Sequence, residues 1–595
     1  MEKNRNYIIA IALSIVIVLA WQILYMNPRM EEQRRYQEQQ QALQQANQPT
    51  QSATQPGVSG SLPGGAGSSA TLTRDESIGK SQRVAIETES VIGSINLTGA
   101  RLDDLRLKKY HETVDDSSPN IVLLSPSETN EGYFAEVGYL EGANAGSVPG
   151  ATTEWTLAEG DKLTETTPVT LRYTNDKGVT FTRTISIDAN YMISFTDKVE
   201  NAGTETVTLG TYGRITRNNK PATPSVFVIH EGFIGVNGAG GTLSEEDYDD
   251  VEEAPVALPK ATGGWLGITD KYWAAAIIPQ QDKSFETRYS HFKDGRPRYQ
   301  ADYKADPFTV EPGQSAQLTN LIFAGAKEVP LVDGYEEQYG IQHFDLLIDW
   351  GWFYFITKPM FKLMDFFYRY FGNFGVAILL TTIVVKLVFF PLASKQYASM
   401  AQMKRLQPKM EELKAKHGSD RMAMQQAMMQ LYKEEKVNPV AGCWPMLLQI
   451  PVFFALYKVI YVTIEMRHAP FFGWIQDLSA PDPTSLFNLF GLLPFDVPAF
   501  LLIGIWPIIM GITMFLQMRM NPAPADPTQA MIFNWMPLMF TFMLASFPAG
   551  LVIYWAWNNT LSIAQQALIM KKHGAKIELF DNLVGLFKRK PAEKK

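Results

Sequence analysis

The sequence has 595 residues but only one cysteine, Cys443, and seven histidines. A single cysteine excludes a framework of intramolecular disulfides, so an exported domain of this chain must be stabilised by core packing alone. The histidines stand about fifty or more positions apart, which excludes the closely spaced pairs that bind zinc in metalloproteases. The sequence therefore predicts neither an intramolecular disulfide framework nor a zinc site of the metalloprotease type.

Motifs for nucleotide binding and nucleophilic catalysis are also missing. Residues 79–81 are Gly-Lys-Ser, the end of a phosphate-binding loop, but Arg74 stands where that loop requires glycine. No Gly-x-Ser-x-Gly pentapeptide is present. The sequence predicts no catalytic residues, no metal site and no cofactor, and it indicates a protein that is not an enzyme.

Charge is absent from residues 7–26, a run long enough, at about 1.5 Å per residue, to cross a hydrocarbon core of about 30 Å. A cleaved signal peptide is the alternative, but no small-x-small cleavage site accompanies the run. We expect residues 1–26 to form a signal-anchor transmembrane helix, with Lys3 and Arg5 holding the amino terminus in the cytoplasm. Residues 27–80, rich in Gln, Ser and Gly, predict a disordered tether.

Residues 81–330 change to a period of two, as in VTLRYTNDKGVTFTRTISI, where alternating residues flank a turn at 175–178. Similar short runs recur, with Gly, Asn, Asp and Pro between them. This pattern predicts a large antiparallel β-sandwich outside the membrane.

An aromatic-rich segment follows at residues 341–362. Helical spacing places Phe344, Leu347, Ile348, Trp352 and Phe355 on one face. We expect an amphipathic helix in the outer membrane–water interface, and a helix packed on the β-domain is the alternative.

Five further transmembrane helices are predicted, and the charges of their loops test the topology. The spans are residues 374–391, within a segment 363–392, and residues 442–461, 499–518, 531–547 and 549–569, within 439–570. Segment 393–438 carries nine Lys and Arg and the basic tail 571–595 carries eight, whereas loop 464–498 carries only Arg467. With six spans, both termini in the cytoplasm and the β-domain outside, every loop obeys the positive-inside rule. The tail also predicts a basic amphipathic helix that contacts ribosomes or anionic lipid.

Segment 393–438 predicts a cytoplasmic helical hairpin, because apolar residues repeat at helical spacing on both sides of His417-Gly418-Ser419-Asp420. Most of the methionine stripe is expected to form the seam of the hairpin. Methionine also adapts to many apolar partners, so four residues are candidate contacts for other proteins. They are Met400, Met422, Met424 and Met429.

Lys386 is the one charge in its span, and an ionisable group inside a membrane suggests function. Snorkelling to the cytoplasmic interface is the alternative, since Lys386 lies five residues from Pro391. Other polar residues gather in the inner or middle parts of the spans, which indicates a cavity open to the cytoplasm. They include Thr382, Gln449, Gln517, Asn534, Asn558, Asn559, Ser562, Gln565 and Gln566. Lys458 is interpreted as an outer-end lysine that snorkels.

Several stretches of the carboxy-terminal half resemble the YidC membrane-insertase family, the bacterial relatives of the Oxa and Alb insertases. They include GVAILLTTIVVKLVFFPL, LYKEEKVNPVAGCWPMLLQIPVFFALYKVI and FPAGLVIYWAWNNTLSIAQQ. The first span and the β-domain fit the Gram-negative branch of the family. The resemblance implies a five-helix core around a hydrophilic groove that is open to the cytoplasm and the lipid. It assigns a positive charge in the groove to Lys386, where many members have arginine, and assigns substrate-facing aromatic residues to Tyr554 and Trp555.

The predicted groove thus contains Lys386, Thr382, Gln449, Asn534, Tyr554, Trp555 and Asn559. The resemblance implies an insertase and chaperone that inserts, folds and helps assemble integral membrane proteins, alone or with the Sec translocon, in the inner membrane of a Gram-negative bacterium. Expected partners are nascent membrane proteins, the Sec translocon, the lipid bilayer, and the ribosome or signal recognition machinery.

Two other functions are weighed against this prediction. A channel or secondary transporter predicts inverted repeats, and no such repeat is visible. A carbohydrate-active envelope enzyme built on the β-sandwich would need a close pair of carboxylates in a strand context, which the sequence does not offer.

Overall fold

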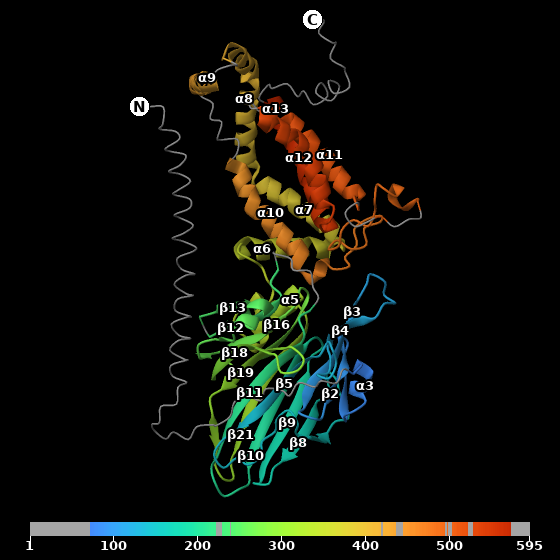
Figure 1. Ribbon diagram of the computed structural model, residues 1–595, viewed down its shortest axis with the longest axis vertical. Helices are drawn as coiled ribbons and strands as arrows, with labels where there is room; N and C mark the ends of the chain where they lie inside the picture. The colour runs from blue at the N-terminus through green and yellow to red at the C-terminus, as the bar shows by residue number, and fades with distance from the viewer. Residues whose placement is uncertain are drawn as a thin grey trace.

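The computed structural model describes residues 72–221, 229–238, 240–417, 421–435, 444–493, 497, 502–521 and 527–572. The strands lie at one end of the molecule and the carboxy-terminal helices at the other (Figure 1). The predicted first span, residues 27–71 of the predicted tether, and the tail beyond residue 572 lie outside the described residues.

Two sheets make up the amino-terminal part. Their strands are β1 (Arg83–Glu87), β2 (Val91–Asn96), β3 (Arg101–His111), β4 (Asn120–Leu124), β5 (Tyr133–Glu141), β6 (Thr156–Glu159), β7 (Lys162–Leu163), β8 (Val169–Thr174), β9 (Val179–Ile187), β10 (Met192–Asn201), β11 (Val207–Asn218), β12 (Gly232–Asn237), β13 (Thr242–Asp247), β14 (Val256–Ala257), β15 (Ala261–Thr262), β16 (Gly264–Thr269), β17 (Trp273–Ile278), β18 (Ser284–Phe292), β19 (Arg298–Ala305), β20 (Phe308–Val310) and β21 (Ser315–Ala326).

One sheet has twelve strands, with the path β14-β18-β19-β11-β5-β3-β2-β1-β7, and the other has nine, in the order β13-β12-β16-β17-β21-β10-β9-β8-β6. Every pairing is antiparallel except the short β1–β7 pair. Inward-facing apolar side chains of both sheets form one continuous core, with Trp265 and Phe323 among its fully buried members. The predicted β-sandwich is confirmed.

The β8–β9 hairpin shows how local sequence sets the register. Strand β9 alternates buried and more exposed residues, as the period of two predicts. In the predicted turn the Asn175 side-chain oxygen accepts hydrogen bonds from the backbone N–H groups of Lys177 and Val179, both at 3.0 Å. Gly178 adopts a φ of 77°, which favours glycine. The turn therefore joins β8 to β9, and Thr174 and Thr180 are the facing pair of residues nearest to it.

The ordered domain begins earlier than the sequence predicted. Residues 72–80, assigned to the tether, include helix α3 (Arg74–Ile78), which starts with a capping box between Thr73 and Glu76. The Ser77 hydroxyl donates to Glu128 at 2.8 Å, which fastens this helix to the sandwich. Composition hid this short helix because its stability comes from the cap and the contact with the domain.

The segment 341–362, predicted as one interfacial helix, divides into a 3-10 helix on the sandwich and the first turns of a separate α-helix. Helix α5 (Val329–Tyr339) follows the last strand, and the 3-10 helix η3 (Phe344–Leu347) then packs on the sandwich, with the Phe344 ring against Trp265 and Phe323. Only after residue 353 does helix α6 (Tyr354–Phe371) begin. The expected helix start was therefore wrong, and three of the five residues of its apolar face, Phe344, Leu347 and Ile348, belong to the buried core. Phe355, by contrast, is exposed.

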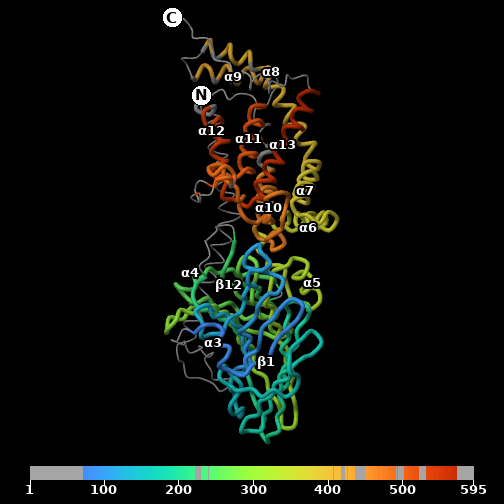
Figure 2. Tube along the Cα trace, turned by 90° about the vertical axis from the view of Figure 1, so that its right-hand side faces the viewer, coloured from blue at the N-terminus to red at the C-terminus, as the bar shows by residue number. Residues whose placement is uncertain are grey.

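The remaining helices are α7 (Phe374–Val388), α8 (Phe390–His417), α9 (Arg421–Glu434), α10 (Trp444–Val462), α11 (Ile505–Met520), α12 (Pro527–Leu544) and α13 (Ala549–Lys572). Helices α8 and α9 lie at the end of the molecule farthest from the strands (Figure 2). Within the described ranges no single helix is both long and apolar enough to cross a membrane. The pair Phe374–Val388 and Phe390–Leu406 meets the criterion together, with a bend of 68° between its halves.

Side chains at and beyond the carboxy-terminal end of α10 join the helices to the sandwich. The Lys458 ammonium forms an ion pair with Asp349 at 2.6 Å, so this lysine is buried and paired, and the snorkelling interpretation was wrong. Beyond α10, the Glu465 carboxylate accepts a hydrogen bond from the backbone N–H of Val329 at 2.8 Å. Arg467 donates to the backbone carbonyl of His111 at 2.6 Å. Three contacts of different chemistry thus connect the two parts.

Candidate functional site

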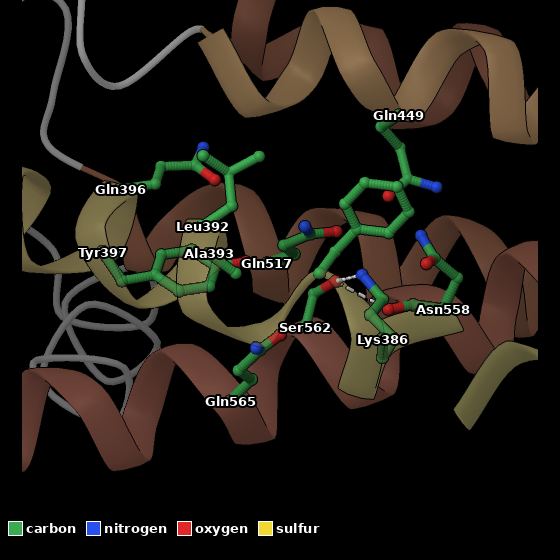
Figure 3. A pocket seen from close by; sticks show the side chains of 11 residues that line it. Lys386, Leu392, Ala393, Gln396, Tyr397, Gln449, Gln517, Asn558, Ser562 and Gln565 are labelled. Carbon is green, nitrogen blue, oxygen red and sulfur yellow. Dashed lines mark hydrogen bonds between the residues drawn. The ribbon is translucent and has the colours of Figure 1, made fainter. Parts of the chain in front are cut away.

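A polar cavity of about 160 Å³ lies between α7, α8, α10, α11 and α13 (Figure 3). Side chains from all five helices, together with Phe389 at the bend between α7 and α8, enclose it. The lining residues are Lys386, Phe389, Leu392, Ala393, Gln396, Tyr397, Gln449, Gln517, Asn558, Ser562 and Gln565. Lys386 is the one charged residue among them, so the cavity has a net positive charge.

Lys386 points across the cavity to the last helix (Figure 3). Its ammonium donates a hydrogen bond to the Ser562 hydroxyl at 2.7 Å, and that hydroxyl donates to the backbone carbonyl of Asn558 at 2.7 Å. Asn558, Ser562 and Gln565 follow one another at spacings of four and three, so they share one face of α13. The predicted clustering of these polar groups therefore places three hydrogen-bonding side chains beside one cation.

Two buried atoms of the lining lack a hydrogen-bond partner among the described protein atoms: Asn558 Oδ1 and Gln565 Nε2. Buried polar groups are nearly always satisfied by protein or water, so the cavity is suited to water or to a polar segment of another molecule. In the part of the chain that the structure describes, no three His, Cys, Asp or Glu side chains are grouped closely enough to hold a metal ion.

The predicted aromatic pair lies beside the cavity and does not line it. Gln449 donates to the Tyr554 hydroxyl at 3.3 Å, which links a lining residue to this buried tyrosine. Trp555 is half-buried, and its ring centroid lies 4.8 Å from that of Phe453 and 5.6 Å from that of Phe540. The pair thus extends from the polar cavity to an aromatic surface between α10, α12 and α13.

The other predicted groove residues are placed elsewhere. The buried Thr382 hydroxyl donates to the carbonyl of Ile378 in its own helix, at 2.7 Å. Asn559 donates to the Thr513 hydroxyl of α11 at 3.4 Å. Asn534 is exposed on α12 and is not among the lining residues. Of the seven predicted residues, the structure brings Lys386 and Gln449 together in the cavity wall.

Sequence reasoning missed Gln396 and Tyr397, which line the cavity from the first turns of α8. Both were assigned to the cytoplasmic hairpin. The bend after α7 turns this part of the chain back beside Lys386. A signal was present in the sequence, because polar residues begin directly after the apolar run, but only the bend gives them this position.

Helices α8 and α9 pack on each other within the segment predicted as a hairpin, 393–438, although α8 starts earlier, at Phe390, and residues 418–420 and 436–438 lie outside the described part. Lys409 and Glu435 form an ion pair at 2.5 Å, and Leu406 and Leu431 are buried. Met400 and Met424 are half-buried, whereas Met422 and Met429 are about half exposed. The last two are therefore the most accessible of the four candidate contact residues.

An apolar helical part with a cationic cavity, joined to a β-sandwich, is the architecture of a membrane-associated protein. Residues 83–363 match the family described as YidC periplasmic domain, and residues 366–576 match the family described as 60Kd inner membrane protein. Relatives named membrane protein insertase YidC are 75% identical in Agrobacterium fabrum and 71% identical in Rhizobium etli, over 100% of both chains in each case. The chain belongs to the YidC family.

A solved structure described as an active YidC insertase with the first transmembrane domain resolved is also similar. It is 17% identical, with a TM-score of 0.33, over 82% of this chain and 92% of that chain.

Proposed function

We propose that this protein is a membrane protein insertase and chaperone that inserts, folds and helps assemble integral inner-membrane proteins, alone or with the Sec translocon. Membership of a family whose relatives carry the name insertase supports this function. The observation that carries it is the cavity around Lys386, a cation site lined by polar side chains among apolar helices. The relatives' name describes a non-enzymatic role, and the proposal requires no nucleotide and no cofactor.

The proposed topology has six spans, with both termini in the cytoplasm and the β-sandwich in the periplasm of a Gram-negative bacterium. Residues 1–26 form the first span, and α7 and α10 to α13 form a five-helix core. The cavity is the inner end of a hydrophilic groove that opens to the cytoplasm. Lys and Arg in segments 393–438 and 571–595, against one Arg in 464–498, support this orientation.

A groove of this kind lowers the barrier to moving a short hydrophilic tail outward, because the tail meets water and hydrogen-bonding groups through part of the bilayer. Burial of the client's own apolar helix supplies the remaining drive, at about 25 cal/mol per Å². Lys386 attracts acidic residues of the translocating tail. Tyr554 and Trp555, beside the cavity, line the exit toward lipid.

The α8–α9 hairpin is proposed to receive clients and their delivery machinery. Exposed methionines at Met422 and Met429 offer an adaptable apolar surface, and Met400 and Met424 extend it. The ribosome or the signal recognition machinery contacts this hairpin and the basic tail. Photo-crosslinking from positions 386, 554 and 424 in cells should capture the same client at successive stages.

Substitution of Lys386 tests the central proposal. Lys386→Arg should be nearly silent because charge and reach are preserved. Lys386→Ala should slow insertion of clients with acidic translocated tails far more than of clients with neutral tails, and Lys386→Glu should be worse. The measurement is protease protection of matched acidic-tailed and neutral-tailed clients in cells with equal levels of each variant.

Lys395→Ala, an exposed lysine of α8, is the matched control and should leave both clients unaffected. An unhydrated lysine in lipid costs about 3 kcal/mol or more. If Lys386 had no function, its replacement by alanine would therefore leave insertion of both clients unchanged. Equal insertion of both clients by a stably accumulated Lys386→Ala variant would exclude charge attraction.

A further inference from the structure

A second polar cavity, of about 320 Å³, lies in the β-domain, on the face of the twelve-stranded sheet turned away from the nine-stranded sheet. Five cationic side chains and one carboxylate line it, together with hydroxyl and amide groups. The cations are Lys80, Arg101, Arg214, Arg296 and Arg298, and the carboxylate is Glu128. The hydroxyl and amide groups belong to Ser77, Ser81, Asn96, Thr98, Ser127, Thr152, Thr216, Asn218 and Gln300.

Strand register explains why these residues meet. In β11, Arg214, Thr216 and Asn218 are two residues apart, so their side chains share one face. Arg214 pairs with Glu136 of β5, Thr216 with Gln300 of β19, and Asn218 with Arg298 of β19. The neighbouring residues of opposite phase, Ile215 and Ala301, belong to the core between the sheets. The floor of the cavity is therefore rigid sheet, which holds the polar groups in fixed positions.

Two arginines share a single carboxylate in this floor. Glu136 accepts from Arg214 at 3.1 Å and from Arg101 at 3.3 Å, and the Tyr212 hydroxyl donates to its second oxygen at 2.7 Å. Although burial raises the pKa of Glu136, the two guanidinium groups outweigh it and hold the pKa below its ordinary value. Glu136 is thus ionised, and the Arg101–Glu136–Arg214 triad carries one positive charge in excess.

Of the other charges in the lining, the Glu128 carboxylate offsets one positive charge, Arg298 is neutralised by its partner, and two cations add to the excess. Arg298 is paired with Asp294 at 2.7 Å, and Glu128 accepts hydrogen bonds from Ser77 and Ser127. Lys80 and Arg296 add two more cations at the rim. A buried excess of positive charge is costly unless an anion or a carboxylate approaches it.

We propose that this cavity is a binding site for a carboxylate-bearing ligand whose neighbouring hydroxyl or amide groups bind the polar side chains around it. Guanidinium groups bind carboxylates with directional, charge-assisted hydrogen bonds. The Arg101 guanidinium lies over the Phe134 ring, 4.7 Å from its centroid, which fixes its plane and covers the one aromatic ring of the lining. Recognition therefore depends on charge and hydrogen bonds. An acidic sugar and an acidic peptide segment share this chemistry.

Calorimetric titration of the full-length protein in detergent micelles tests the site with two matched pairs of probes. Glucuronate is compared with glucose, and an acetylated, amidated Glu-Glu dipeptide with its Gln-Gln counterpart. In at least one pair the acid should bind about tenfold or more tightly than its neutral counterpart. The pair that shows this preference identifies the source of the carboxylate.

Arg101→Gln should weaken binding of the preferred acid about tenfold, and Lys80→Gln, an exposed rim residue, about threefold. Because Arg101 also pairs with Glu136, the unfolding midpoint of each variant is measured beside its affinity. Lys109→Gln, an exposed lysine near the far end of β3, is the control and should not change affinity. The proposal fails if neither acid binds more tightly than its neutral counterpart, or if folded Arg101→Gln and Lys80→Gln variants bind as the unaltered protein does.

Discussion

Single charged residues in the helical part are placed beside specific partners. Lys386 donates to Ser562, and Lys458 pairs with Asp349, which also accepts a hydrogen bond from the backbone N–H of His230 at 2.9 Å. The first lysine lines a cavity, whereas the second joins two parts of the molecule. Lysines in apolar helices therefore have two different structural roles within this one chain.

The Lys458–Asp349 pair should contribute to stability mainly through the cost of breaking it. Lys458→Met or Asp349→Asn alone should lower the free energy of unfolding by about 3 kcal/mol, because each change breaks a buried ion pair. The double variant should recover part of this loss. Thermal unfolding of all four proteins in detergent completes the cycle, and strictly additive losses would contradict a direct interaction.

The helices and strands differ in how far sequence alone could place them. The β8–β9 hairpin was predicted correctly because its alternation and its Asn175–Gly178 turn are local features. The helix expected over residues 341–362 was wrong at its start, because Phe344 can be buried equally well in a membrane interface or in the sandwich. Choosing between these partners requires the tertiary structure.

The same limit applies to the cavity. Lys386 and Gln449 were predictable because a lone polar group is conspicuous in an apolar helix. Asn534 was assigned to the groove by the same reasoning, yet α12 is apolar on several sides and gives no indication of which way a polar residue points. Tyr397 needed the bend after α7, which the sequence did not predict.

The α8–α9 hairpin permits a test that separates contact from folding. Replacing both Met422 and Met429 by Ser should change the free energy of unfolding by no more than about 0.5 kcal/mol, because both side chains are exposed. Client crosslinking at the hairpin should nevertheless decrease. Leu431→Ala, in the buried seam, should instead cost about 2 kcal/mol. Unchanged crosslinking by the double Met variant would remove these residues from the proposed contact surface.

At the scale of the whole molecule, the junction between sandwich and helices contains an acid that responds to pH. Burial raises the pKa of Glu465 to about 7, and the nearby carboxylates Glu328 and Asp365 add to the effect, although the N–H of Val329 opposes it. The folded protein then binds this proton more tightly than the unfolded chain does. The free energy of unfolding therefore falls as pH rises from about 4.5 to about 7.

Glu465→Gln should remove this dependence while keeping an oxygen for the N–H of Val329. Its unfolding midpoint should exceed that of the unaltered protein at pH 8 and match it near pH 5, with a gain of at most about 3 kcal/mol. Differential scanning fluorimetry at both values measures it. Glu337→Gln, an exposed residue of α5, should show no such difference. Equal midpoints for Glu465→Gln and the unaltered protein at pH 8 would contradict the assignment.

Deletion of residues 90–320 should leave insertion of a simple client largely intact, because the cavity is built entirely from helices outside that range. The deletion retains Asp349, Val329 and Glu465, and it removes His111, the partner of Arg467. The measurement is protease protection of the client at matched protein levels. Loss of client insertion by a deletion variant that accumulates normally would show that the sandwich is required for insertion.

The continuity of α8 has a mechanical consequence. Between its start at Phe390 and Pro408 this helix is a lever arm of about 27 Å, and Tyr397 lies about 10 Å along it. A tilt of about 5° would displace the far end by roughly 2 Å but the cavity wall at Tyr397 by only about 1 Å. A displacement of the hairpin is thus smaller at the cavity wall than at its own tip. Conversely, a slight widening of the cavity corresponds to a larger displacement at the tip. A displacement of roughly 2 Å at the far end of α8 is thus compatible with a shift of only about 1 Å in the wall beside Lys386.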